Sequence, residues 1–129
     1  MADRLEEVVT RLRAFVAERE WGQFHDPKNL SMAVASEAGE LLAEYRWLAS
    51  DASDAWSREP ENKRRAAMEA ADVGISLLMF CDRIGVDLVE AMKAKIELNA
   101  VKYPVAEVRG RHSRPGGVPG GERYGPEDR

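Results

Sequence analysis

Apolar side chains recur at three- and four-residue intervals over most of the first 103 residues, and alternating β-branched stretches are scarce. This period is typical of helices that bury one face. It predicts helices over residues 3–20, 30–48, 61–84 and 88–103. The polar stretch 49–59 is predicted to be a loop or a short turn. Four helices with short connections predict an all-α fold, arranged as a small four-helix bundle.

Residues with strong preferences for helix ends lie between these segments. The second segment is preceded by Asp26-Pro27-Lys28-Asn29, a cluster that favours the end of one helix and the start of another. Asn29 is either the N-cap of the second segment or a ligand-binding side chain. Gly85 fits the position after a helix C-terminus, because glycine readily adopts the left-handed conformation. Residues 87–90 fit a capping box at the start of the fourth segment, and Pro104 ends that segment.

The third segment is apolar on two nearly opposite faces. One face includes Val73 and Leu77, and the other includes Ile75 and Met79. A helix that is apolar on two faces is normally buried on both, and one small bundle does not cover both. We therefore expect a second subunit against one of these faces.

Two acidic side chains interrupt the apolar run of this segment. Between Ala66 and Cys81, Glu69 and Asp72 are the only ionisable side chains besides the cysteine. Burying a carboxylate without compensation costs several kcal/mol, on the order of 3 to 5. The cations nearest in sequence, residues 63–65, stand at the start of the segment. A divalent cation is the better compensation.

A matching pair of acids lies on the second segment. Glu37 and Glu40 are one helical turn apart beside its apolar stripe, and Glu44 lies on the same strip. Facing Glu69 and Asp72, they would form a cage of oxygen ligands, which suits Mg²⁺, with Mn²⁺ as the alternative, and does not suit zinc. The competing interpretation is a solvated acidic face, since Glu-x-x-Glu alone is a weak signal. A ferritin-like di-iron site needs Glu-x-x-His, which the sequence lacks.

Composition narrows the class of protein. The 129 residues are 44% apolar and 33% charged, enough for one small domain. The single cysteine, Cys81, excludes an internal disulfide and a four-cysteine zinc site, and it favours a reducing compartment. The net charge is −4, whereas nucleic-acid-binding domains usually carry an excess of lysine and arginine. No apolar run is long enough for a membrane span. We expect a cytoplasmic protein that binds neither nucleic acid nor membrane.

The chain is predicted to divide near Pro104, into a folded all-α domain over 1–104 and a tail over 105–129. Residues 104–129 hold six glycines, four prolines and five arginines. Such a segment buries too little apolar surface to offset its ordering entropy, so we expect it to be flexible. An arm that binds phosphate or a partner is the alternative.

Three motifs together resemble the MazG-like family of all-α nucleoside triphosphate pyrophosphohydrolases. Residues 37–40 and 69–72, with 28 residues between them, are similar to its Glu-x-x-Glu…Glu-x-x-Asp signature. The stretch Glu18-Arg19-Glu20-Trp21-Gly22-Gln23-Phe24-His25-Asp26-Pro27-Lys28-Asn29-Leu30 is similar to the dCTP pyrophosphatase branch in particular. The final motif is Lys95-x-x-x-Asn99-x-x-Lys102-Tyr103-Pro104. The resemblance covers residues 5–104.

The resemblance implies hydrolysis of a nucleoside triphosphate to the monophosphate and pyrophosphate, which clears the nucleotide pool. It implies Mg²⁺, and assembly as a dimer or a dimer of dimers. It implies the metal ligands Glu37, Glu40, Glu69 and Asp72. The expected substrate is dCTP or a modified pyrimidine nucleotide. Glu40 or Asp72 would accept the proton of the attacking water, and the sequence does not choose between them.

The fourth segment carries the residues expected to bind phosphate. Lys95, Asn99 and Lys102 stand at positions i, i+4 and i+7, on one stripe. Spacing alone indicates a solvated face with extended lysines. The resemblance instead implies phosphate contacts for Lys95 and Asn99, and Lys102 shares their stripe. Tyr103 either contacts a phosphate or packs at the helix end.

A nucleobase needs a flat, partly apolar slot with a few polar groups. The residues expected to form it are Trp21, Phe24, His25, Asn29 and Trp47. For the tryptophans the alternative is packing near a helix end, and for His25 it is a structural hydrogen bond.

Two positions depart from the dCTP-preferring pattern. Leu12 stands where that branch tends to have a histidine, and Ser76 where it tends to have a tyrosine. Both lie near the expected nucleoside pocket, so a broad or purine-preferring hydrolase is an alternative. A non-catalytic helical dimerisation or nucleotide-binding module on the same scaffold is another. The complete set of acids argues against that module, because a purely structural bundle would gain by making those positions apolar.

Overall fold

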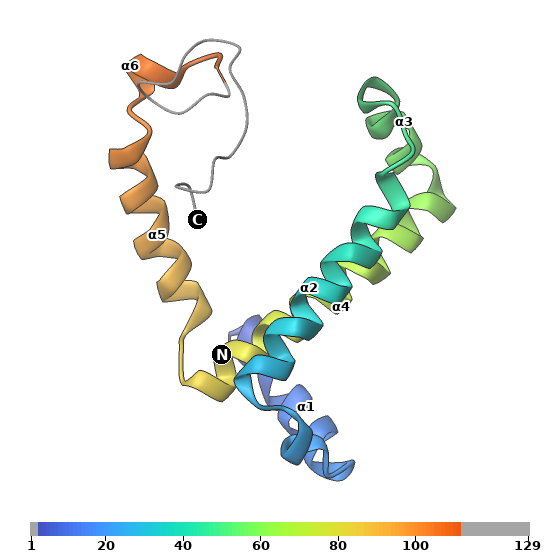
Figure 1. Ribbon diagram of the computed structural model, residues 1–129, viewed down its shortest axis with the longest axis vertical. Helices are drawn as coiled ribbons and strands as arrows, with labels where there is room; N and C mark the ends of the chain where they lie inside the picture. The colour runs from blue at the N-terminus through green and yellow to red at the C-terminus, as the bar shows by residue number, and fades with distance from the viewer. Residues whose placement is uncertain (1–2, 112–129) are drawn as a thin grey trace. The chain divides into compact units, whose positions relative to one another are not determined.

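The structure is a computed structural model that describes residues 3–111, and every regular element in that range is helical (Figure 1). In chain order the elements are α1 (Arg4–Glu18), the 3₁₀ turn η1 (Trp21–Phe24), α2 (Pro27–Tyr45), the 3₁₀ turn η2 (Ser50–Ala52), α3 (Ser53–Arg58), α4 (Pro60–Ile84), α5 (Leu88–Lys102) and α6 (Val105–Val108). The all-α prediction is confirmed. None of these helices is both long enough and apolar enough to cross a bilayer.

The chain divides into two units, one ending at Leu88 and the other beginning at Val89. The first unit holds α1 to α4, and the second holds nearly all of α5 together with α6. The predicted domain limit at residue 104 remains a prediction, as does the packing of the fourth segment in a bundle. Most of the predicted tail, residues 112–129, lies outside the described residues.

The start of α2 differs from the prediction by three residues. The N-cap is Asp26, whose Oδ1 accepts a hydrogen bond of 2.8 Å from the backbone N–H of Asn29. Pro27 follows at the first helical position, where its missing N–H leaves no bond unmade and its fixed φ suits the helix. Asn29 is therefore inside the helix, and its assignment as the N-cap was wrong.

Residues 49–59 are more ordered than a loop. They form η2 and α3, and α3 packs on α4. The rings of Tyr45 and Trp56 meet edge to face with centroids 5.1 Å apart, and the Tyr45 hydroxyl lies 3.0 Å from Ser57 Oγ. These contacts hold the short helix at the end of α2, so tertiary packing stabilises a helix whose local sequence is polar.

The C-terminus of α4 is formed as predicted. Gly85 follows the last helical residue with φ of 70°, in the left-handed region. Its N–H donates to the Asp82 carbonyl, and the N–H of Val86 donates to the Cys81 carbonyl at 2.9 Å. This pattern satisfies two carbonyls that the helix itself leaves free.

The first unit is built on α2 and α4, which lie side by side and run antiparallel (Figure 1). Leu30 of α2 and Cys81 of α4 are its buried apolar side chains, with Ser76 of α4 as the buried polar one. α1 packs against α4, and the Arg13 guanidinium joins them by donating from Nε to both Asp82 oxygens at 3.0 and 3.1 Å. This packing brings the acidic stretches of α2 and α4 together.

The second apolar face of α4 is covered in part by the same chain. Ile75 and Met79 line a cavity that α1 closes from the other side. This stripe alone therefore does not require a second subunit. Other large apolar side chains of the first unit remain exposed, among them Met68 of α4 at 54% and Leu42 of α2 at 60%.

Candidate functional site

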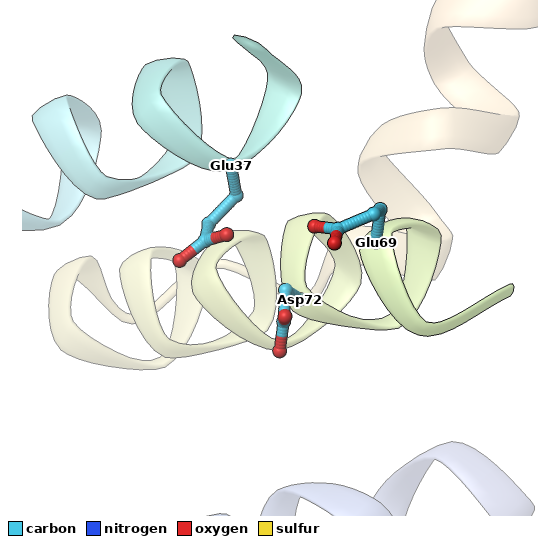
Figure 2. A group of neighbouring side chains, drawn as sticks. All are labelled: Glu37, Glu69 and Asp72. Atoms are coloured by element: carbon cyan, nitrogen blue, oxygen red, sulfur yellow. The ribbon is translucent and has the colours of Figure 1, made fainter. Parts of the chain in front are cut away.

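Three carboxylates from two helices converge in the first unit. Glu37 of α2 and Glu69 and Asp72 of α4 each offer one oxygen, and these oxygens all lie within 4.8 Å of one another. Figure 2 shows the Glu37 side chain extending from α2 toward α4, which carries the other two. Glu37 and Glu69 are half-buried and Asp72 is exposed. The packing of α2 on α4 thus places acids 32 to 35 residues apart in sequence around one point.

The electrostatics of this cluster are unfavourable in the absence of a cation. The pKa of Glu69 is raised, first by desolvation and then by the negative charges of Asp72, Glu40, Glu44 and Glu37. Like charges crowded in a partly desolvated place favour protonation of one of them, or the binding of a positive ion. A donor set made only of carboxylate oxygens suits a hard divalent cation. The residues present therefore fit a metal of this type.

Glu40 lies near the cluster without joining its closest group. Its charge contributes to the raised pKa of Glu69, but its oxygens are not among those within 4.8 Å of one another. It is an exposed residue one turn along α2 from Glu37. Three of the four predicted ligands come together, and the role of Glu40 as a ligand remains a prediction.

Arg65 supplies a positive charge beside the cluster, a role that the sequence did not suggest. Its Nη2 lies 2.8 Å from Oε2 of Glu44, whose side chain is only 14% exposed. The two atoms form an ion pair, but their alignment is not that of a hydrogen bond, so this buried oxygen has no hydrogen-bond partner. Glu44 is thereby compensated by an arginine, while none of the three converging acids has an ion pair within residues 3–111.

An open cavity of about 720 Å³ adjoins the cluster and includes two of its acids, Glu37 and Asp72. α1 and η1 line the cavity opposite α4, with Trp21 and His25 among the lining residues. The Trp21 ring lies 6.4 Å from the His25 ring, centroid to centroid. The cavity therefore combines an acidic end with apolar and aromatic walls, as a nucleotide site requires.

Both positions that depart from the dCTP-preferring pattern also line this cavity. Leu12 lies on α1 and Ser76 on α4. Arg11 is the single lysine or arginine among the residues that line it, and the sequence analysis assigned it no role. An isolated arginine in an amphipathic helix gives no signal of this kind, because only the packing of α1 on α4 shows where it points.

Three of the predicted nucleoside-binding residues lie elsewhere in this chain. Phe24 is 59% exposed and Trp47 is 85% exposed, and neither lines the cavity. The Arg46 guanidinium lies over the Trp47 ring, 5.3 Å from its centroid. Asn29 donates from Nδ2 to the Phe24 carbonyl at 3.0 Å, which ties η1 to the start of α2. Nucleoside contacts for these three remain predictions.

The predicted phosphate-binding residues belong to the second unit. Lys95, Asn99 and Lys102 lie on α5, and Tyr103 follows its last residue. The Lys102 ammonium stands over the Tyr103 ring, 5.5 Å from the centroid. Within this unit their shared stripe is as expected, and their contact with phosphate remains a prediction.

A smaller cavity of about 270 Å³ also has His25 among its lining residues. Its polar side chains are Arg13, Asp82 and Arg83, besides His25 itself. Arg13 hydrogen-bonds Asp82, and Arg83 donates to the Gly22 carbonyl at 3.2 Å. These groups already have partners, and none of the three converging acids lines this cavity.

Comparisons with known proteins point to one group of enzymes. No family model matches the chain. Among curated proteins, dCTP pyrophosphatase 1 of Rattus norvegicus is 41% identical over 108 residues, covering 81% of this chain and 62% of that protein. dCTP pyrophosphatase 1 of Homo sapiens is 36% identical over 99 residues, covering 76% of this chain and 58% of that protein. The chain thus spans about three fifths of the length of these relatives.

A solved structure agrees with the sequence comparisons. The crystal structure of a pyrophosphatase from Archaeoglobus fulgidus matches with a TM-score of 0.75 and 36% sequence identity, covering 81% of this chain and 95% of that one. The match combines a shared all-α fold with substantial identity. Together with the acidic signature, these findings show that the chain belongs to the MazG-like family of all-α nucleoside triphosphate pyrophosphohydrolases.

Proposed function

We propose that this chain hydrolyses a nucleoside triphosphate to the monophosphate and pyrophosphate, with dCTP or a modified pyrimidine nucleotide as substrate and Mg²⁺ as cofactor. The observation that carries the proposal is the convergence of Glu37, Glu69 and Asp72 at one end of a cavity whose walls include Trp21 and His25. The names of the relatives, dCTP pyrophosphatase 1, support the choice of reaction and substrate.

The acids would hold the metal, and the metal would bring the triphosphate to an acidic protein. Glu37, Glu69 and Asp72 are the proposed ligands, with Glu40 as the fourth. When bound, Mg²⁺ neutralises phosphate charge and polarises phosphoryl oxygens, which is the largest part of catalysis in phosphoryl transfer. Mn²⁺ offers the same preference for oxygen ligands and is the expected substitute.

The carboxylates would also manage the proton of the attacking water. Attack at the α-phosphorus breaks its bond to the oxygen that bridges to the β-phosphorus, and pyrophosphate leaves. The water must lose a proton in this step, and a carboxylate within hydrogen-bond reach can accept it. Glu40 and Asp72 are both exposed members of the acidic region and are the two proposed bases.

The other phosphate contacts and the nucleoside contacts are proposed from the chemistry of the side chains. Lys95, Asn99, Lys102 and Tyr103 are proposed to contact phosphate, because cations and amide donors match its oxygens. Trp21 and His25 are proposed to contact the nucleoside within the cavity. Phe24, Asn29 and Trp47 are proposed nucleoside contacts in the assembled protein, since none of them lines the cavity of one chain.

The chain is proposed to self-associate as a dimer or a dimer of dimers. Few side chains of residues 3–111 are buried, and several large apolar ones stay in contact with solvent. Trp47 is the extreme case, with 85% of its surface exposed. Exposed apolar surface of this extent is typical of an interface between subunits.

The reaction is tested by product analysis with a panel of nucleoside triphosphates, Mg²⁺ and ¹⁸O-labelled water. We expect a monophosphate that carries the label, together with unlabelled pyrophosphate. Label in the pyrophosphate, or release of inorganic phosphate and a diphosphate, would contradict attack at the α-phosphorus. If the panel gives no turnover with any nucleotide, the non-catalytic module is the better account.

A further inference from the structure

One hydroxyl group that lines the cavity has no hydrogen-bond partner among residues 3–111. Ser76 is 5% exposed and is the buried polar side chain of residues 3–111. It lines the 720 Å³ cavity, and its hydroxyl makes no hydrogen bond within the described part of the chain. Glu44 Oε2, and not the Ser76 hydroxyl, is the fully buried side-chain oxygen without a hydrogen-bond partner in residues 3–111, so the hydroxyl keeps contact with the open cavity. Water satisfies the hydroxyl there when the cavity is empty, and a ligand that displaces this water must supply the hydrogen bond itself.

The position of Ser76 relative to the acids restricts that partner. Ser76 follows Asp72 by four residues on α4, so the two side chains lie on the same face, ~6 Å apart along the helix axis. Both residues line the cavity. A ligand whose charged end lies at the acids therefore meets Ser76 within one helical turn of that end.

We propose that the Ser76 hydroxyl hydrogen-bonds the 3′-hydroxyl group of the deoxyribose. This inference rests on the proposed function, in which the α-phosphate lies at the acids. The sugar follows the α-phosphate directly in a nucleotide and comes before the base. Its 3′-hydroxyl can both donate and accept, as the serine hydroxyl can. The base, which is farther from the phosphate, is left for the aromatic wall at Trp21.

A cycle of enzyme and substrate changes tests this contact. The substrates are dCTP, dTTP, dATP and dGTP, each compared with its 2′,3′-dideoxy counterpart, which lacks the 3′-hydroxyl. We expect the wild-type chain to favour the deoxynucleotide in kcat/KM by about threefold to tenfold. Ser76→Ala should lose this preference, and Ser76→Thr, which keeps a hydroxyl, should retain it. If Ser76→Ala lowers kcat/KM equally for both members of each pair, or for neither, the assignment is overturned.

Controls separate this contact from folding and from the reaction. Ser31→Ala removes a hydroxyl that donates to the Lys28 carbonyl outside the cavity, and it should leave the preference unchanged. Ser76→Val matches the shape of Ser76→Thr without the hydroxyl, so a preference retained in the valine variant would also overturn the assignment. Thermal unfolding of each variant checks that the fold survives.

A binding measurement keeps the inference testable if the proposed reaction fails. Calorimetry with dCMP and with 2′,3′-dideoxy-CMP compares the same two sugars without turnover. We expect wild type to bind dCMP about threefold to tenfold more tightly, and Ser76→Ala to bind the two equally. Equal binding by the wild-type chain, or no binding of dCMP, would overturn the assignment whatever the activity measurements give.

Discussion

Glu69 is the carboxylate on which the charges of the acidic region act most clearly. Its pKa is raised by desolvation and by four neighbouring acids, Asp72, Glu40, Glu44 and Glu37. Arg65 is paired with Glu44, the outermost of these acids along α2. Within the part of the chain that the structure describes, the negative charge around Glu69 is therefore not compensated. A cation site needs such a charge, whereas a helix pair with a purely structural role has no use for it.

The first prediction concerns the stability of the metal-free protein. Glu69 ionises at a higher pH in the folded chain than in the unfolded chain, so the unfolded state releases this proton first. Its contribution to stability is thus present below the ordinary glutamate pKa and is lost as pH rises through the raised value. Without metal, the Tm of Glu69→Gln should increasingly exceed that of wild type as the pH rises above the ordinary glutamate pKa of about 4.3.

At neutral pH and with Mg²⁺ present, wild type should instead have a higher Tm than Glu69→Gln. Mg²⁺ should stabilise wild type by about 2.7 kcal/mol when its concentration is ~100 times its Kd, and it should stabilise Glu69→Gln much less. Calorimetric melting with and without EDTA measures both effects. A wild-type Tm that does not respond to Mg²⁺ at pH 7 would count against the cation site.

The second prediction concerns Trp21 and the base. Stacking of a base on an aromatic ring is worth ~1–3 kcal/mol, so Trp21→Ala should raise the KM of the preferred nucleotide about tenfold. Trp21→Phe keeps a flat ring and should retain most of the affinity. Equal KM values for wild type and Trp21→Ala would show that the ring only packs against Phe15, whose centroid is 5.8 Å away.

Sequence patterns identified the acidic residues but not their separate environments. From their i, i+3 spacing, Glu37 and Glu40 were equally good candidates for metal ligands. In the structure, Glu37 belongs to the group of carboxylates within 4.8 Å of one another, and Glu40 does not. The difference depends on the rotation of α2 about its axis, which is set by packing on α4. The Arg65–Glu44 ion pair was missed for the same reason, because its partners come from different helices.

At the scale of the elements, Gly85 ends α4 three residues before the first unit ends at Leu88. Gly85 has φ of 70°, which costs other residues about 1–2 kcal/mol. Gly85→Ala should lower the free energy of unfolding by about this amount, measured by urea denaturation. Gly85→Asn is the matched control, since asparagine tolerates the left-handed conformation and should cost less. Equal stability of wild type and Gly85→Ala would show that the chain leaves α4 in another way.

Helix positions followed from the sequence because periodic apolar residues and end signals act locally. The predicted helix over 61–84 corresponds to α4 (Pro60–Ile84), and the one over 88–103 corresponds to α5 (Leu88–Lys102). The short helix α3 was not predicted, since its stability comes from the contact of Tyr45 with Trp56. Of the two alternatives for Asn29, the N-cap was wrong: Asp26 and Asn29 both have suitable side chains, and Pro27 favours the earlier start.

At the scale of the whole molecule, the exposed apolar side chains of the first unit predict self-association. Sedimentation equilibrium at tens of micromolar should give at least twice the mass of one chain. Met68, on α4, is 54% exposed, and Met68→Lys would place a charge in any interface that covers this face. If this face is the interface, the variant should shift the protein toward monomer. A wild-type chain that sediments as a monomer would contradict the proposed assembly.

The two-faced helix was a sound reason to expect neighbours, but the sequence did not show which neighbour covers which face. Ile75 and Met79 line the cavity together with residues of α1 from the same chain, so this part of the stripe faces a cavity and not a second subunit. The spacing of apolar residues predicts that a helix face is buried, but it does not show which element or subunit covers that face. The same limit applies to Trp47, which follows the end of α2 at Tyr45, is 85% exposed and does not line the cavity.

The central claim is that converging carboxylates of α2 and α4 hold the cation used in hydrolysis. It is tested most directly by the rate of pyrophosphate release from dCTP at saturating Mg²⁺, in wild type, Glu69→Gln and Glu7→Gln. Glu7 is an exposed acid in the first turn of α1 and serves as the matched control. We predict that Glu69→Gln lowers the rate at least ~100-fold and that Glu7→Gln leaves it unchanged. A Glu69→Gln variant as active as wild type would contradict the account.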